Sequence, residues 1–72
     1  MIKVNGHDVE WVEGLTVAAL LEKLSKDDRF TYAINSTTTV MINREVIPRN
    51  DYPVRLLQEG DVILLYPQLM GG

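Results

Sequence analysis

Hydrophobic and polar residues alternate at the start of the chain. Ile2 and Val4 precede the dipeptide Asn5-Gly6, and Val9 and Trp11 follow it. Alternation of this kind is typical of strands buried on one side, and Asn-Gly suits the positive φ angles of a two-residue turn. The pattern predicts a β-hairpin whose second strand reaches Trp11 and ends at the following Glu13-Gly14.

A helical stripe of apolar residues comes next. Its members, spaced at i, i+3, i+4 and i+7, are Val17, Leu20, Leu21 and Leu24. This spacing predicts one amphipathic helix over about residues 17 to 25. Thr16 is placed as its N-cap, and Leu15 and Leu20 are placed to form a hydrophobic staple across that cap.

The middle of the chain carries weaker signals. Phe30, Tyr32 and Ile34 alternate with other residues, which favours a short strand or an extended arm. The polar run Ser36 to Thr39 favours a loop. Within residues 26 to 38 we therefore expect a turn, this extended piece and then a loop.

A second hairpin is predicted after that loop. Val40 to Ile42 and Glu45 to Ile47 form its two arms around a tight turn at Asn43-Arg44, and Pro48 stops the second arm because proline lacks an amide donor. Further along, we expect Leu56 and Leu57 to lie under the sheet in one helical turn.

Val62 to Tyr66 form the last predicted strand. Five consecutive apolar residues favour a strand that is covered, at least partly, on both faces. Val62, Leu64 and Tyr66 point to one face, and Ile63 and Leu65 point to the other. The elements together predict an α+β domain with one helix on one face of a mixed sheet of four or five strands. The other face then meets either connecting segments, such as residues 48 to 58, or a partner.

Composition narrows the class of protein. Seventy-two residues make one small domain, and the absence of cysteine excludes disulfides, thiolate metal sites and thiol nucleophiles. The net charge is −3 and the basic residues are dispersed, which argues against a nucleic-acid partner. The sequence contains neither a run long enough for a membrane span nor a signal pattern, so we expect no membrane partner and a cytoplasmic location.

No candidate catalytic or metal site emerges from the residues. His7 is the only histidine, and we interpret it as a surface turn residue rather than a base. Asp27-Asp28 lacks the other ligands of a calcium loop, and the glycines form no nucleotide-binding motif. Trp11 and Tyr66 are interpreted as partly buried sheet residues. We expect no catalytic residue, no metal and no bound cofactor.

The last six residues follow the final strand with no element left to pair with. We therefore predict a folded domain over 1–66 and a flexible tail over 67–72. Gly71 and Gly72 have no Cβ, so this end is thin enough to enter a narrow channel. The terminal carboxylate is ionised at neutral pH and can attack an activated phosphate. The alternative is a frayed terminus that happens to end in two glycines.

Element order and tail together resemble the ubiquitin-like sulfur carriers of the ThiS and MoaD type. The body of the chain is similar to the thiamine branch over more positions, whereas the tail is closer to the molybdopterin synthase small subunit. Gly60-Asp61 and Gly71-Gly72 are shared by both branches. The segments that resemble the thiamine branch are Ile2 to Gly6, Glu13 to Val17, Leu20-Leu21, Ile42 to Arg49 and Leu57 to Asp61, and the one closer to the molybdopterin subunit runs from Tyr66-Pro67 to Gly72.

The resemblance implies a β-grasp fold and a carrier rather than an enzyme. In this family a ThiF/MoeB-like adenylating enzyme uses ATP and magnesium to activate the terminal carboxylate, and a sulfur donor protein converts it to a thiocarboxylate. Gly72 would carry that group, Gly71 would leave it unhindered, and Leu69 and Met70 would contact the partner's channel. The sulfur would pass to thiazole synthase, for thiamine, or to the molybdopterin synthase large subunit.

The sequence is also compatible with two proteins of another class. The first is a β-grasp interaction module, which would bind through the exposed sheet face and lose binding when a charge is placed at Ile63 or Leu65, whichever is exposed. The second is a ubiquitin-like modifier joined to lysines through Gly72.

Overall fold

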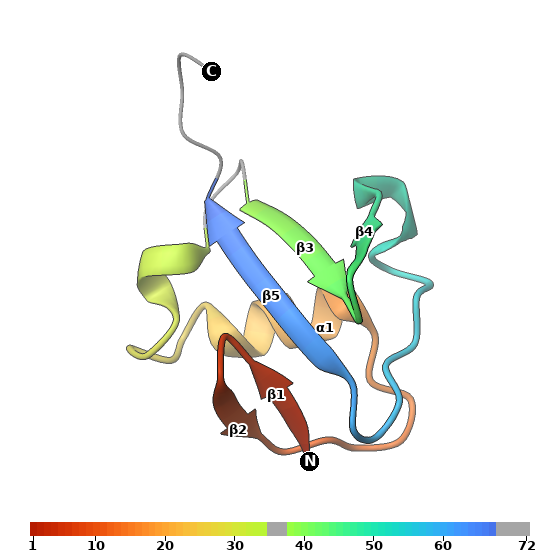
Figure 1. The fold of residues 1–72 in the computed structure, drawn as a ribbon, viewed down its shortest axis with the longest axis horizontal. Helices are drawn as coiled ribbons and strands as arrows, with labels where there is room; N and C mark the ends of the chain where they lie inside the picture. Colours follow the sequence, from red (N-terminus) through yellow and green to blue (C-terminus); the bar gives the residue numbers. More distant parts are fainter. Residues whose placement is uncertain (35–37, 68–72) are drawn as a thin grey trace.

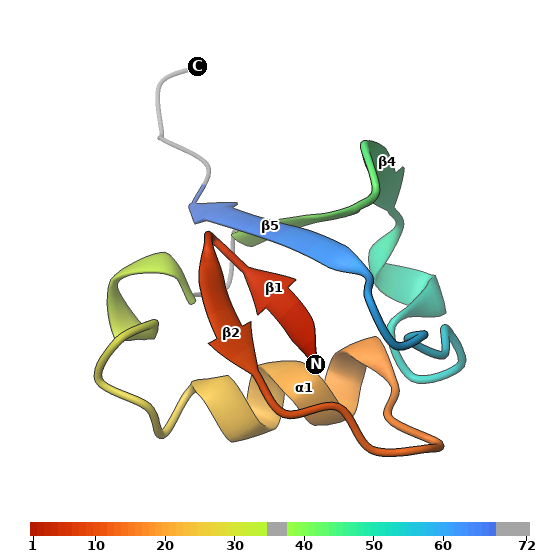
Figure 2. The same ribbon diagram turned by 60° about the horizontal axis from the view of Figure 1, so that its bottom comes forward.

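The computed structural model describes residues 1–34 and 38–67, and in this part of the chain five strands form one mixed sheet. Their order across the sheet is β2-β1-β5-β3-β4, with β1 and β5 parallel and the other neighbours antiparallel. The α-helix packs against one face (Figures 1 and 2). This is the predicted β-grasp arrangement. The elements are β1 (Ile2–Val4), β2 (His7–Val9), α1 (Val17–Leu24), β3 (Thr38–Ile42), β4 (Glu45–Ile47) and β5 (Val62–Pro67), with 3₁₀ helices η1 (Thr31–Ala33) and η2 (Arg49–Asp51).

The helix begins where its cap predicts. The Thr16 hydroxyl accepts a hydrogen bond from the Ala19 N–H at 3.1 Å, which satisfies one of the amides that the first turn leaves free. Leu15 and Leu20, on either side of the cap, are both buried, as a staple requires. The helix ends at Leu24, one residue earlier than expected, with Ser25 as C-cap.

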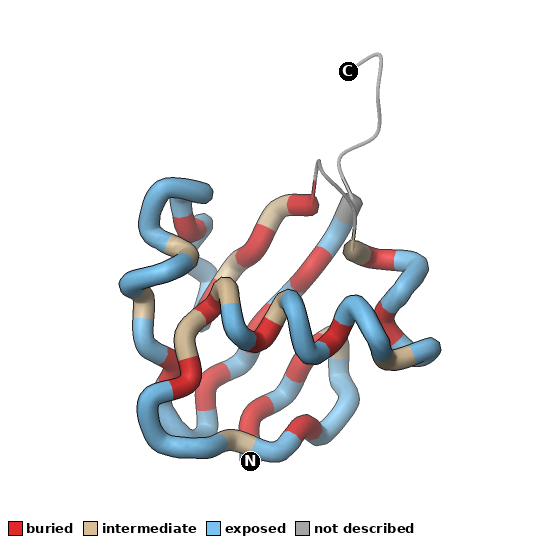
Figure 3. Tube along the Cα trace, turned by 180° about the vertical axis from the view of Figure 1, so that it is seen from behind, coloured by how far each residue is buried: buried red, intermediate tan, exposed pale blue. Residues whose placement is uncertain are grey.

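One core lies between the helix and the sheet. Buried and exposed residues alternate along the strands, as the colours in Figure 3 show, because successive side chains of a strand point to opposite faces. The fully buried side chains of largest volume are Phe30, Ile2, Leu20, Leu24, Ile42, Leu57, Ile63, Val4, Val17 and Val40. For so small a chain, this single core supplies most of the favourable free energy of folding.

Both predicted hairpin turns are confirmed. Asn5 and Gly6 have φ angles of 51° and 85°, and Asn43 and Arg44 have φ angles of 50° and 75°. Two successive positive φ angles define the turn whose twist matches that of the flanking strands. The second arm of the β3–β4 hairpin ends at Ile47, directly before Pro48, as predicted.

The first hairpin is shorter than predicted. β2 ends at Val9, so Trp11 lies beyond the sheet rather than in it. Trp11 is half-buried, as expected, because its ring packs against the core and its indole Nε1–H donates to the Leu57 carbonyl at 2.8 Å. Trp11, which the alternating pattern predicted to lie in a strand, therefore packs against the core from outside the sheet.

The extended arm predicted over residues 30 to 34 is wrong. The chain forms the 3₁₀ helix η1 there, because a turn lets both Phe30 and Ala33 enter the core while Tyr32 stays 63% exposed. An extended arm would have pointed Phe30 and Tyr32 to the same side. The loop predicted for Ser36 to Thr39 is wrong in its described part, since Thr38 and Thr39 belong to β3 and pair with β5.

The helical turn predicted at Leu56 and Leu57 is also wrong. Leu57 is buried, but Leu56 is 50% exposed and forms a single antiparallel bridge with Thr16. The Leu57 N–H donates to the Leu15 carbonyl at 2.8 Å, so this segment is extended and its neighbouring side chains point apart. The helical turn lies earlier, at η2.

Candidate functional site

The predicted modification residue Gly72 and the tail residues Leu69, Met70 and Gly71 lie outside the described residues. The structure does describe β5, the strand that directly precedes them in the chain. β5 occupies the centre of the sheet and runs to Pro67, one residue beyond its predicted end (Figure 1). The C-terminal residues therefore follow directly from the central strand of the sheet.

The central strand is exposed on the face opposite the helix. Val62, Leu64 and Tyr66 are 49%, 41% and 43% exposed, whereas Ile63 and Leu65 are buried. The predicted cover is complete on the inner face and only partial on the outer face, where the three side chains keep 41% to 49% of their surface exposed. A charge that tests this face must therefore be placed at Val62, Leu64 or Tyr66. Ile63 and Leu65 point into the core.

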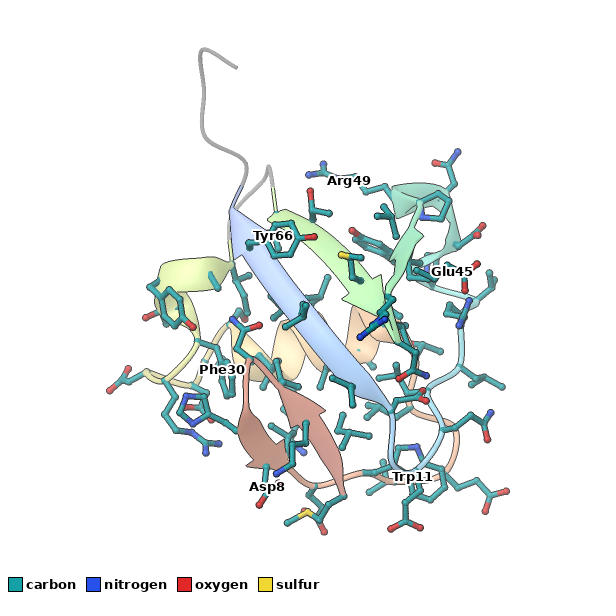
Figure 4. All side chains as sticks on the ribbon, viewed as in Figure 1. Asp8, Trp11, Phe30, Glu45, Arg49 and Tyr66 are labelled. Atoms are coloured by element: carbon teal, nitrogen blue, oxygen red, sulfur yellow. The ribbon has the colours of Figure 1, made fainter. Side chains whose placement is uncertain are left out.

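The exposed apolar residues of β5 continue across the sheet. Met41 lies opposite Leu64 on one side and opposite Val46 on the other, and directly opposed residues of antiparallel strands share a face. Val46 is 58% exposed, and the Tyr66 hydroxyl donates to the Met41 sulfur. Figure 4, which views this face, shows Tyr66 extending from β5 towards β3. We call Met41, Val46, Val62, Leu64 and Tyr66 the outer apolar strip.

One ion pair borders the strip. On the β1–β2 side, Lys3 Nζ lies 2.7 Å from Asp8 Oδ1, and this hydrogen bond lowers the pKa of the Asp8 carboxyl. The Arg55–Glu45 pair, 3.8 Å apart, belongs to the helix-facing side of β4, because Glu45 lies opposite the buried Ile42. An apolar centre with a polar border is the usual make-up of a protein-binding surface. The outer apolar strip is therefore a candidate surface for binding another protein.

His7 takes part in packing at the exposed hairpin. Its ring forms a T-shaped contact with the ring of Phe30, with the centroids 5.4 Å apart, and the Arg29 guanidinium lies over the Phe30 ring, 5.1 Å from its centroid. Arg29 also hydrogen-bonds Asp27 at 2.9 Å, which lowers the pKa of that carboxyl. Over residues 1–34 and 38–67, histidine and acidic side chains form no group of three or more that could hold a metal ion. No described helix is long and apolar enough to span a membrane.

Sequence reasoning missed two kinds of residue at this site. Met41 and Val46 were interpreted only as strand residues, although their register with β5 makes them part of the strip. Asn5 and Asn43 were interpreted only as turn residues, whereas their side chains bind the backbone of β5. Both omissions have one cause, because each role depends on the order of the strands and not on the local pattern.

Comparison with known proteins agrees with the fold and extends through the tail. The sequence model of the ThiS family matches residues 2–72. The sulfur carrier protein ThiS of Escherichia coli (strain K12) is 32% identical over 71 residues, which cover 99% of this chain and 97% of that protein. The crystal structure of the thiamine biosynthesis protein ThiS from Geobacter metallireducens superposes with a TM-score of 0.75 at 27% identity, over 99% of this chain and 97% of that one.

A solution structure of a thiamine biosynthesis protein from Geobacter metallireducens gives a TM-score of 0.65 at 28% identity, over 99% of this chain and 85% of that chain. The family match includes the segment Tyr66 to Gly72. Fold, tail and sequence similarity thus agree, and the chain belongs to the ThiS family of ubiquitin-like sulfur carriers.

Proposed function

We propose that this chain carries sulfur as a thiocarboxylate on Gly72 and donates it for the thiazole moiety of thiamine. The observation that carries the proposal is the ThiS-family match over residues 2–72, which includes both terminal glycines. The relatives' names, a sulfur carrier protein and a thiamine biosynthesis protein, support the same role.

The proposed chemistry takes place at the main-chain carboxylate. An oxygen of the Gly72 carboxylate attacks the α-phosphorus of ATP on a ThiF-type enzyme, and pyrophosphate leaves. The terminal sulfur of a persulfide donor then attacks the acyl carbon, and AMP leaves. A thiol cleaves the resulting acyl disulfide, forms a disulfide with the donor sulfur, and leaves the thiocarboxylate on Gly72. The carrier is thus a co-substrate, while ATP and magnesium are bound by the partner.

Docking of the activating enzyme would use the outer apolar strip. Tyr66 belongs to the strip and directly precedes Pro67, the last described residue before the tail. An enzyme that receives the C-terminus therefore comes close to Tyr66 and Leu64. Burial of these exposed side chains would supply hydrophobic binding energy without using the tail.

A carrier lacking its last residue tests the modification site. The full chain and a form without Gly72 are each incubated with the ThiF-type adenylating enzyme of the same organism, and ATP–pyrophosphate exchange is measured. We expect exchange only with the full chain, because Gly71 would present its carboxylate one residue too short. Equal exchange with both forms would contradict the assignment of Gly72.

Molybdopterin synthesis is the second candidate, favoured by the tail from Tyr66 to Gly72. The two pathways are distinguished by giving the thiocarboxylated chain to thiazole synthase and, separately, to a molybdopterin synthase large subunit. Consumption of the thiocarboxylate by thiazole synthase alone supports the thiamine role. Consumption by the large subunit alone would transfer the proposal to the molybdopterin branch.

An interaction module that uses the strip and not the tail is the candidate of another class, and the exposure of Leu64 and Tyr66 is what favours it. It predicts that removal of Gly72 leaves partner binding and biological activity unchanged. A ubiquitin-like modifier would instead give covalent adducts of the chain with lysines of other proteins. Either result would displace the carrier proposal.

A further inference from the structure

The last residues of β5 extend beyond the strand beside them. β1 pairs with β5 through Lys3 and Val4, and its ladder closes with a hydrogen bond from the Asn5 N–H to the Ile63 carbonyl at 3.0 Å. The chain then turns away at Asn5-Gly6 into β2. No residue of β1 is therefore paired with Leu65.

The side chain of Asn5 takes the place of the missing strand. Its Oδ1 accepts the Leu65 N–H at 2.8 Å, and its Nδ2 donates to the Leu65 carbonyl at 2.9 Å and to the Tyr32 hydroxyl at 3.0 Å. The carboxamide thus satisfies both backbone groups of Leu65, as a neighbouring strand would. On the other side of β5, β3 pairs with Tyr66 and Pro67.

In the other hairpin, Asn43 binds both backbone groups of Val62, at the opposite end of β5. The Asn43 N–H donates to the Val62 carbonyl at 2.8 Å, and the Asn43 Oδ1 accepts the Val62 N–H at 3.0 Å. Its Nδ2 donates to Asp61 at 2.9 Å. Both asparagines have positive φ angles, so the two sites match in backbone geometry and in the strand they hold. They differ in position, since Val62 begins β5 and Leu65 lies near its end.

We infer that Asn5 is a positioning residue for activation of the C-terminus. Its hold on Leu65, together with the pairing of Tyr66 and Pro67 with β3 on the other side, fixes the end of β5 and hence the direction in which the chain leaves the sheet at Pro67. A fixed starting direction reduces the conformational entropy that is lost when the terminal carboxylate enters the enzyme's site. The inference rests on the proposed function, because it assigns Asn5 a part in the same activation reaction.

The matched variants are Asn5→Gly and Asn43→Gly. Glycine accepts positive φ, so each variant removes a carboxamide without straining its turn. Thermal unfolding and amide exchange are measured first, and exchange of the Leu65 amide is expected to accelerate only in Asn5→Gly. In ATP–pyrophosphate exchange with the ThiF-type enzyme, Asn5→Gly lowers kcat on the order of tenfold, the cost of releasing about one ordered residue. Its KM changes less than about twofold, because the outer apolar strip is intact.

Asn43→Gly keeps the wild-type kcat, even if its thermal stability falls as far as that of Asn5→Gly. Equal kcat values for the two variants, whether both fall or both stay, would overturn the inference. Failure of the wild-type chain to be activated would instead overturn the proposed function. If Asn5→Gly does not fold, kcat is measured for Asn5→Asp instead. This variant keeps the bond from the Leu65 N–H but sets an oxygen against the Leu65 carbonyl, so a lowered kcat supports the role and an unchanged kcat overturns it.

Discussion

Arg44 has a φ angle of 75° at the second position of the β3–β4 turn. A residue with a Cβ is strained there, whereas glycine is not. We predict that Arg44→Gly raises the free energy of unfolding by roughly 0.5–1 kcal/mol, after the greater freedom of glycine in the unfolded chain is counted. Urea denaturation measures the change. Arg44→Ala is the control that removes the charge and keeps the Cβ, and an equal gain from it would show that backbone strain is not the cause.

The Lys3–Asp8 ion pair makes the free energy of unfolding depend on pH. The hydrogen bond from Lys3 lowers the pKa of Asp8 in the folded chain. The stabilisation is therefore complete above the ordinary carboxyl pKa and is lost as the pH falls through the lower folded pKa. Lys3→Met should raise the pKa of Asp8 in an NMR titration and leave that of Asp27 unchanged, because Asp27 is held by Arg29. An unaltered Asp8 pKa would refute this cause.

At the scale of elements, the helix depends on its N-cap. The Thr16 hydroxyl accepts the Ala19 N–H at 3.1 Å, and alanine in its place leaves that amide without its partner. We predict that Thr16→Ala lowers the free energy of unfolding by about 1 kcal/mol, measured by thermal or urea denaturation. Thr16→Ser restores the hydroxyl and most of the stability. If serine is as destabilising as alanine, the lost methyl group and not the cap is responsible.

Local patterns predicted the elements whose determinants lie within a few residues. The stripe from Val17 to Leu24 and its cap define the helix, and Asn5-Gly6 and Asn43-Arg44 define the hairpin turns. In each case the signal is a periodicity or a φ preference that the residue carries with it. The bounds of β4 were predicted as the structure has them, and the end of β5 to within one residue.

Elements that depend on the rest of the molecule were predicted less well. Phe30 belongs to a 3₁₀ turn because the core accepts it in that conformation, and Thr38 and Thr39 form strand because β5 is present to pair with them. Leu57 is buried through its contacts with the segment around Leu15 and Trp11, more than forty positions away. Such residues carry no local signal, since their conformation is decided by tertiary contacts.

At the scale of the whole molecule, sequence alone separated the two faces of β5 but did not show which one is open. The structure puts Ile63 and Leu65 against the helix and exposes Leu64 and Tyr66, because the register with β1 and β3 places them so. The outer apolar strip is thus a property of β3, β4 and β5 together. The assignment of Gly72, in contrast, rests on the sequence alone and stays a prediction, because its chemistry would be that of the terminal carboxylate.

The open face gives a prediction about partner binding. Leu64→Asp places a charge in the outer apolar strip without touching the core, so the fold should persist while KM for activation by the ThiF-type enzyme rises about tenfold or more. Val54→Asp is the matched control, because Val54 is 71% exposed and lies outside the strip. Circular dichroism checks folding, and ATP–pyrophosphate exchange gives KM. Equal KM values for the two variants would exclude the strip as the docking surface.

We propose that the sulfur is held by the main chain at Gly72, which suits a protein without cysteine. The most direct test is intact-protein mass spectrometry, with fragmentation, after incubation with ATP, magnesium, the adenylating enzyme, a persulfide donor and a thiol. We predict a mass increase equal to the exchange of one oxygen for sulfur, confined to the C-terminal fragment that contains Gly72 and absent without ATP. An unchanged mass, or an increase in any other fragment, would show that Gly72 does not carry the sulfur.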